Sequence, residues 1–599
     1  MASSTEARDQ AEASPAAAAV PTLEDLQQWT WVMGRAQQLM LEFLAAQASA
    51  GAKVLSGDGK AASPRPVPVP WPDPASIAEA QTQLWTEGLH IWQRALGVYT
   101  DRTELEDKAD RDKRFAARAW QDNPLFDMIR QSYILVSERL LGSVDAVEGL
   151  EEPARDRLRF ATKAFVDAMA PSNFILTNPQ VIARAVETKG ESLLKGLEYM
   201  LRDLGKGQLT HTDPEAFEVG RNIAVTPGKV IKQTPLYQLI QYAPTTEQVY
   251  QTPLIIFPPW INRFYILDLN PRKSFIRWAV EQGLTVFVVS WKSADQSLAD
   301  TVMDDYVLAQ VDAIDTVRAL LEVPAVHTIG YCVAGTTLAA TLALLAARGE
   351  EDKVASATFF TAQVDFSEAG DLSLFVGDEQ LGLIRQLSAE KGFLDGRYMA
   401  ATFNLLRGQD LIWNYVVNHY LLGEEYPPFD LLHWNGDTTN LPAKWHQAYL
   451  DQLYRQNLLV RPGALTVDGT PIDLSKVQTP TYVQAGREDH IAPARSVWKI
   501  THHFRGPLRF VLAGSGHIAG VVNPPDANKY QYWTNDAPVT TLDEFVAGAS
   551  ETKGSWWPDW RGWVAERSGP RMPPTGARVP GGGSLPAIED APGSYVRGR

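Results

Sequence analysis

The segment from Ala325 to Thr336 constrains the fold more than any other part of this chain. It reads AVHTIGYCVAGT, in which an apolar, β-branched run ends at Gly330 and a helix of small residues begins after Gly335. This pattern predicts a strand, a tight turn and a helix, with Cys332 at the apex. Small residues on both sides give a strained turn the room that it needs. The segment therefore matches the G-x-S-x-G nucleophile elbow, with Cys332 for serine and Ala334 for the second glycine.

Two other residues favour a chemical role for Cys332, the only cysteine among 599 residues. A lone cysteine is more often a small buried hydrophobe than a nucleophile. Here, however, Asp489 and His517 follow two later predicted strands, in the order nucleophile, acid, base that α/β-hydrolases share. The carboxyl ends of such strands meet at one edge of a sheet. We therefore expect a triad in which His517 accepts the thiol proton and Asp489 orients the imidazole.

Rival acids and bases lie next to the predicted acid. Glu488 and His490 flank Asp489, and each would point elsewhere if the backbone there is extended. Most of the other histidines are expected on the surface or as satisfied core residues. No spacing of histidine and cysteine suits a metal ion, so the sequence predicts no metal site.

Acyl-transfer chemistry also needs donors for a developing oxyanion. The first expected donor is the backbone N–H of Val333, at the start of the helix that follows Cys332. The second should come from the loop 257–263, whose two prolines carry no N–H. The donor must then be Trp260, Ile261 or a later residue, and we favour Ile261. The double proline also has a simpler interpretation, as a strand stop.

The rest of the C-terminal part has the rhythm of a parallel sheet. Short apolar runs alternate with helical patterns, and near-continuous apolar strands are typical of buried parallel strands. We expect strands or helices at 254–257, 271–282, 284–291, 301–321, 355–364, 479–486 and 507–512. The predicted fold class is α/β, an α/β-hydrolase-like doubly wound sheet over 215–599. Aromatic residues are frequent in 365–442, which we interpret as an inserted cap.

The N-terminal part is predicted to be all-helical. Residues 1–22 are rich in Ala, Ser and Glu and predict a disordered tail, and 23–214 form the helical domain. Within that domain, 50–74 contains many prolines and is interpreted as a flexible linker. The longest apolar stretch, 336–347, is too short to span a membrane, so no transmembrane segment is expected.

Charge and cysteine content restrict the partners and the compartment. The formal net charge of −16 argues against a nucleic-acid partner. The first ten residues include acidic side chains and no long apolar core, so no signal peptide is predicted. A single cysteine excludes an intrachain disulfide, which favours a cytoplasmic location.

Several motifs, taken together, resemble those of class I polyhydroxyalkanoate synthases. They are NFILTNP at 173–179, FPPWINRFYILDL at 257–269, GYCVAGT at 330–336, WNGDTTNLP at 434–442, REDHI at 487–491, SGHIAG at 515–520 and GSWWPDW at 554–560. The resemblance extends from about residue 75 to the end of the chain. The whole set of motifs is more specific for the family than any one of them. The chain departs from the family at Ala334, where glycine is usual; alanine still meets the need for a small residue.

The resemblance implies a polymerising acyltransferase. Its substrate would be an (R)-3-hydroxyacyl-CoA, in particular 3-hydroxybutyryl-CoA, and its product a polyhydroxyalkanoate polyester. CoA would be the leaving group, so no cofactor is expected. The resemblance further implies a homodimer at the surface of cytoplasmic storage granules. The alternatives are a cysteine-dependent α/β-hydrolase of the thioesterase or dienelactone-hydrolase type and an inactive granule coat protein. The intact triad argues against the coat protein.

Some expectations concern substrate binding and the handling of the chain. We expect a substrate pocket at Trp260, Tyr331, Trp413 and Trp434. Arg272, Lys273 and Arg277 are candidates for CoA entry, although we favour a solvated helix face as the interpretation of these residues. One cysteine per chain excludes shuttling between two thiols of one subunit. Either two subunits each contribute Cys332, or one acyl intermediate is held without a covalent bond; we prefer the second hypothesis.

Overall fold

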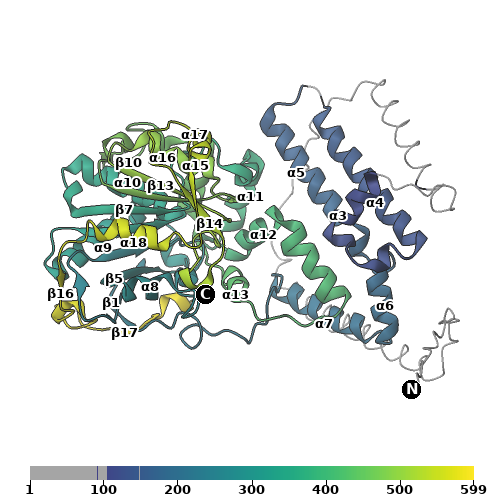
Figure 1. Cartoon of the computed structure of the whole chain (residues 1–599), viewed down its shortest axis with the longest axis horizontal. Helices are drawn as coiled ribbons and strands as arrows, with labels where there is room; N and C mark the ends of the chain where they lie inside the picture. Colours follow the sequence, from purple (N-terminus) through teal and green to yellow (C-terminus); the bar gives the residue numbers. More distant parts are fainter. Residues whose placement is uncertain (1–90, 92–103, 148, 599) are drawn as a thin grey trace, which may run out of the picture. The chain divides into compact units, whose positions relative to one another are not determined.

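The computed structural model describes residues 91, 104–147 and 149–598 (Figure 1). The chain divides into two compact units. Of the described residues, the first contains 159–207, 413–425 and those before 151; the second contains 151–158, 208–412 and 426–598. The predicted tail 1–22 and linker 50–74 lie outside the described residues. The predicted domain boundaries stay predictions.

The N-terminal part is helical, as predicted. Its helices are α3 (Glu104–Arg111), α4 (Pro124–Asp145), α5 (Glu152–Ala168), α6 (Pro179–Glu187) and α7 (Glu191–Lys206). The first unit also contains η9 (Val416–Leu421), which packs on α7. Tyr420 donates a hydrogen bond to Asp203 over 2.7 Å, and a side chain at Gly196 would collide with the Tyr420 backbone. A short stretch from within the predicted cap range 365–442 is therefore part of the helical unit.

The second unit is built on an eleven-stranded sheet in the order β15-β14-β13-β12-β7-β6-β4-β5-β2-β1-β17. Strands β5, β4, β6, β7, β12 and β13 pair in parallel, and antiparallel strands extend both edges. The strands are β1 (Gly228–Gln233), β2 (Tyr237–Tyr242), β4 (Leu254–Phe257), β5 (Val286–Trp291), β6 (Val326–Tyr331), β7 (Val354–Phe360), β12 (Thr481–Gly486), β13 (Leu508–Ala513), β14 (Gln531–Thr534), β15 (Ser550–Lys553) and β17 (Glu589–Asp590). The predicted α/β-hydrolase-like fold is confirmed.

Helices cover both faces of this sheet (Figure 1). Successive residues of a strand point to opposite faces. In β4, Ile255 and Phe257 pack with α9 (Met303–Leu321) and α10 (Val333–Arg348), while Leu254 and Ile256 pack with α8 and α18 on the other face. Helix α8 spans Phe275–Glu281 and α18 spans Trp557–Ala565.

The strand order places a topological switch point between β4 and β6. These neighbours lead into helices on opposite faces, α8 after β4 and α10 after β6. Loops diverge at such a point and leave a crevice at the carboxyl ends of the strands, where ligands bind in open α/β sheets. Cys332 lies directly after β6, at this crevice.

An insertion between β7 and β12 supplies the cap. Its second-unit helices are α11 (Asp378–Ala389), α12 (Gly396–Leu406), α13 (Asp430–Gly436), α14 (Ala443–Ala448) and the π-helical turn η10 (Tyr449–Arg455). Helical structure thus continues for a few turns beyond residue 442, where the cap was predicted to end. Among the described residues, no helix is both long enough and apolar enough to cross a membrane.

Two glycines allow β6 and α10 to approach each other closely. A Cβ at Gly330 would lie 2.5 Å from the Cα of Gly335. A Cβ at Gly335 would lie 2.8 Å from the Gly330 carbonyl oxygen and would also strike the Ala362 methyl group. Ala334, in contrast, lies fully buried in the core between α9 and α10. The second glycine that the close contact needs, beside Gly330, is therefore Gly335, and alanine at 334 is accommodated.

We expect Gly335→Ala to lower the free energy of unfolding by about 1–3 kcal/mol, because backbone must shift to admit the methyl group. Gly562→Ala is the matched control, since Gly562 is an exposed helical glycine with nothing within 4 Å of an added Cβ. The free energy of unfolding of Gly562→Ala should rise by about 0.5–1 kcal/mol. Urea unfolding of both variants measures the difference, and equal effects would contradict the tight contact.

Candidate active site

Cys332 has a strained backbone at the start of α10. Its φ of 53° and ψ of −127° lie in a region that side-chain-bearing residues rarely adopt. The Cys332 N–H donates to the Phe360 carbonyl over 2.9 Å, so neighbouring β7 helps to hold the turn. Cys332 is half-buried, which leaves part of the residue accessible to a substrate.

Asp489 and His517 form a closely packed acid–base pair after β12 and β13. The distance from His517 Nδ1 to Asp489 Oδ2 is 2.7 Å, and the Asp489 side chain has no exposed surface. Asp489 Oδ1 accepts backbone N–H bonds from Ile491 at 2.8 Å and Ala492 at 2.9 Å. The hydroxyl of Tyr331 donates to the His517 carbonyl over 3.0 Å. Both members of the pair are thus fixed by backbone contacts.

The charge of the imidazole is set by these neighbours. Burial opposes protonation of His517, but the charges of the Asp489 carboxylate and of Cys332 raise the His517 pKa to about 10. A histidine in this setting holds a proton readily once it has taken one. The structure therefore brings Cys332, His517 and Asp489 together in an arrangement that can generate a thiolate.

The rival residues lie outside this network. Glu488 is exposed, and His490 is half-buried, where burial lowers its pKa. Among residues 104–147 and 149–598, no group of three or more His, Cys, Asp or Glu side chains is arranged to hold a metal ion.

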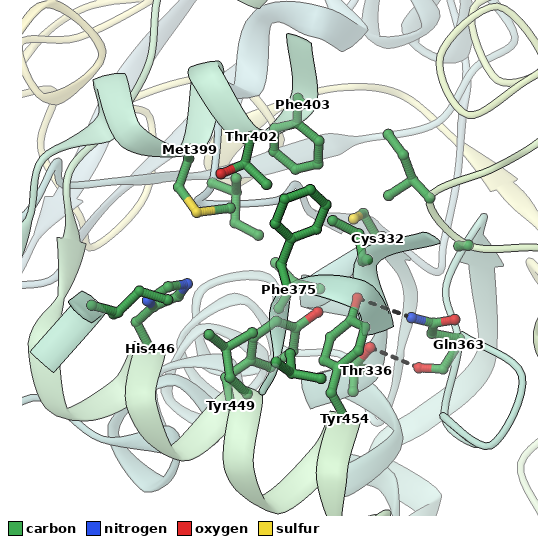
Figure 2. Close-up of a pocket in the computed structure, with 18 of the residues that line it drawn as sticks. Cys332, Thr336, Gln363, Phe375, Met399, Thr402, Phe403, His446, Tyr449 and Tyr454 are labelled. Carbon is green, nitrogen blue, oxygen red and sulfur yellow. Dashed lines mark hydrogen bonds between the residues drawn. The ribbon is translucent and has the colours of Figure 1, made fainter. Parts of the chain in front are cut away.

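Cys332 lines a cavity between the sheet and the cap (Figure 2). The cavity contains about 720 Å³ of space free of protein atoms, its open mouth included, which is within the usual range of ligand pockets. Val333 and Ile261, the two predicted oxyanion donors, line the same cavity. The N–H of Val333 has no acceptor within its own helix, because it belongs to the first turn.

Most of the cavity wall is apolar and comes from the cap. Its aromatic side chains are Phe375, Phe403, Tyr449 and Tyr454, and the aliphatic ones include Leu372, Val376, Ile384, Met399 and Leu450. Tyr454 accepts a hydrogen bond from Gln363 Nε2 over 3.3 Å (Figure 2). The sequence indicates an aromatic cap but not which of its side chains face Cys332, because the arrangement of the cap helices depends on tertiary packing.

The four aromatic residues that we expected in the pocket do not line this cavity. Trp260 is buried against Tyr306, with ring centroids 3.9 Å apart. Trp434 donates its indole N–H to the Arg263 carbonyl over 2.7 Å, and Tyr331 supports the His517 backbone. Trp413 is the last residue of η8 (Gln409–Trp413).

The basic residues considered for CoA entry make other contacts. Lys273 pairs with Asp430 over 2.7 Å, and Arg277 pairs with Glu281 over 2.8 Å. Arg272 is exposed. The ion pairs that Lys273 and Arg277 make with these carboxylates favour the simpler interpretation of the basic residues as part of a solvated surface.

The fold and the site define an enzyme of the α/β-hydrolase class. The family model of the α/β hydrolase fold matches residues 252–524, and that of the poly-beta-hydroxybutyrate polymerase (PhaC) N-terminus matches residues 111–279.

Curated relatives identify the family within this class. The poly(3-hydroxyalkanoate) polymerase subunit PhaC of Rhizobium meliloti is 46% identical over 529 residues, which cover 87% of this chain and 85% of the relative. The Cupriavidus necator subunit is 45% identical over 496 residues, covering 82% and 83%. The poly(3-hydroxyalkanoate) polymerase of Methylorubrum extorquens is 45% identical over 529 residues, covering 87% and 86%. The chain belongs to the poly(3-hydroxyalkanoate) polymerase family of acyltransferases.

The raised pKa of His517 predicts a pH-dependent stability. The folded protein binds this proton more tightly than the unfolded chain, whose histidine pKa is about 6.5. The stabilisation is therefore complete below about pH 6.5 and is lost as the pH rises through the folded pKa.

Comparison of Cys332→Ala with Cys332→Ala/His517→Gln measures this effect without thiol ionisation, since Asp489 still raises the His517 pKa. Urea unfolding should show the full difference in stability at about pH 6 and a smaller one in alkali. A difference that grows with pH would contradict the assignment of charges.

Proposed function

We propose that this chain joins (R)-3-hydroxyacyl groups, above all 3-hydroxybutyryl groups, into a polyhydroxyalkanoate polyester and releases CoA. The observation that carries the proposal is the strained Cys332 on the wall of an apolar cavity, with the His517–Asp489 pair beside it. Family membership supports the reaction class. We further propose that the enzyme works at the surface of cytoplasmic polyester granules.

The first step acylates Cys332. His517 takes the thiol proton, and the sulfur attacks the carbonyl carbon of the substrate thioester. The N–H groups of Val333 and Ile261 stabilise the oxyanion of the tetrahedral intermediate. CoA leaves as its thiol, with the proton from His517. One thioester replaces another, so the transfer is close to thermoneutral.

The second step forms the ester bond. His517 takes the proton from the 3-hydroxyl of an incoming hydroxyacyl-CoA, and that oxygen attacks the Cys332 thioester. The C–S bond breaks, the thiol recovers its proton, and the lengthened chain stays on CoA. Repetition of the first step returns this chain to Cys332. Water competes with the hydroxyl, and the apolar wall supports the proposal because it limits access of water.

The incoming unit is held without a covalent bond in this scheme. The chain has one cysteine, so a second thiol could come only from another subunit. We propose a homodimer in which each Cys332 site acts independently.

Incubation of the protein with (R)-3-hydroxybutyryl-CoA should release CoA and form insoluble polyester. Cys332→Ala should abolish both, because no thioester can form. CoA release is followed with a thiol reagent, and the polymer is converted to crotonic acid for quantification. CoA release with only free 3-hydroxybutyrate would contradict the proposal and indicate a thioesterase.

Mixed dimers of wild-type and Cys332→Ala chains test whether the sites are independent. Differently tagged chains allow the heterodimer to be purified. We expect it to retain the full activity per Cys332, which is half the activity of the wild-type dimer. Complete loss would mean that two thiols take part in one reaction.

A further inference from the structure

His446 is a buried polar residue on the wall of the Cys332 cavity that the proposed mechanism does not use. It belongs to α14 and is only 2% exposed. Within the part of the chain that the structure describes, its Nδ1 has no hydrogen-bond partner. Buried polar atoms of folded proteins nearly always have a partner. A ligand in the cavity that His446 lines can supply the missing hydrogen-bond partner.

A second unpartnered polar atom lies on the same wall. Thr361 follows β7, is fully buried, and its Oγ1 has no hydrogen-bond partner among the described residues. The Thr361 N–H donates to the Gln484 carbonyl over 2.8 Å, whereas the Thr361 hydroxyl is unpartnered among the described residues. Two such groups in one cavity favour a ligand that has several oxygen atoms along an otherwise apolar chain.

The surroundings of His446 fit an uncharged ligand. Met399, Ile384 and Leu450 line the same cavity. Burial lowers the pKa of His446 to about 4, so the imidazole is neutral near pH 7. A neutral imidazole does not attract the phosphates of CoA by charge, but it can donate one hydrogen bond to a carbonyl oxygen.

His446 lies farther from Cys332 than the tyrosines of the same wall. Tyr449 and Tyr454 are close enough for the charge of Cys332 to contribute to their raised pKa values, after the larger effect of burial. His446 precedes Tyr449 by three residues, or about 4.5 Å along a helix. Figure 2 shows His446, Tyr449 and Tyr454 in this order along the wall, with Tyr454 on the side of Cys332. One 3-hydroxyacyl unit spans a length comparable to one helical turn.

We propose that His446 binds the growing polyester, donating a hydrogen bond from its imidazole to an ester carbonyl beyond the unit attached to Cys332. The inference rests on the polymerase function proposed above. A polyester offers carbonyl oxygens at regular intervals between aliphatic groups, which matches a single donor in an apolar wall. His446 is thus a binding residue for the second or a later unit, and a single hydroxyacyl group does not reach it.

The test compares two CoA thioesters, that of (R)-3-hydroxybutyrate and that of its linear dimer. For each, kcat/KM for the first equivalent of CoA released reports acylation of Cys332. His446→Leu should lower the ratio of dimer to monomer kcat/KM by roughly tenfold, the effect of one lost hydrogen bond in a buried site. His446→Gln retains an N–H donor and should recover most of the ratio.

His502→Leu is the matched control, because His502 is an exposed histidine of α16 (Ile500–His503) whose Nε2 contacts the Thr540 carbonyl. The ratio of dimer to monomer kcat/KM for His502→Leu should equal that of the wild type. Thermal unfolding verifies that each variant is folded, and His446→Phe replaces the leucine variant if that one is not.

An unchanged ratio in a folded His446→Leu protein would overturn the proposal. An equal fall in kcat/KM with both thioesters would also overturn the proposal, because that result would indicate that His446 contacts CoA or has a structural role. Failure of the wild-type protein to release CoA from either thioester would instead overturn the proposed polymerase function.

Discussion

The close contact between β6 and α10 at Gly330 and Gly335 is the constraint on which the rest of the site depends. It forces the backbone of Cys332 into a conformation with φ of 53°, which costs roughly 1–3 kcal/mol and is held by packing on both sides. The result is a half-buried Cys332 at the apex of the turn, next to the switch point of the sheet.

Parallel strands bring the other two residues to this thiol. Asp489 and His517 follow β12 and β13, and the parallel register of β6, β7, β12 and β13 aligns their carboxyl ends at one edge. The cap then covers that edge with apolar side chains. Acyl transfer to a hydroxyl instead of water requires both features: a base beside the thiol and a cavity that limits solvent. The sheet supplies the first and the cap supplies the second.

The sequence predicted the parts of the structure that depend on local patterns. Apolar runs identified the central strands, and the chain order of Cys332, Asp489 and His517 identified residues that the fold then brings together. The polar and aromatic edge strands, such as 531–534 and 550–553, lack that apolar signal and were not predicted. Trp260 was expected in the pocket but stacks on Tyr306 instead, because the direction of a side chain after a strand depends on tertiary packing. His446 was missed for the same reason.

The central claim is that Cys332 carries the acyl chain as a thioester. The most direct measurement is acid quenching during turnover of (R)-3-hydroxybutyryl-CoA, followed by mass spectrometry of the protease-digested protein. Our account predicts hydroxybutyryl adducts, including oligomers, on the peptide that contains Cys332, and their release by hydroxylamine at neutral pH. Polymer formation with no adduct on that peptide, or with an adduct on another residue, would contradict it.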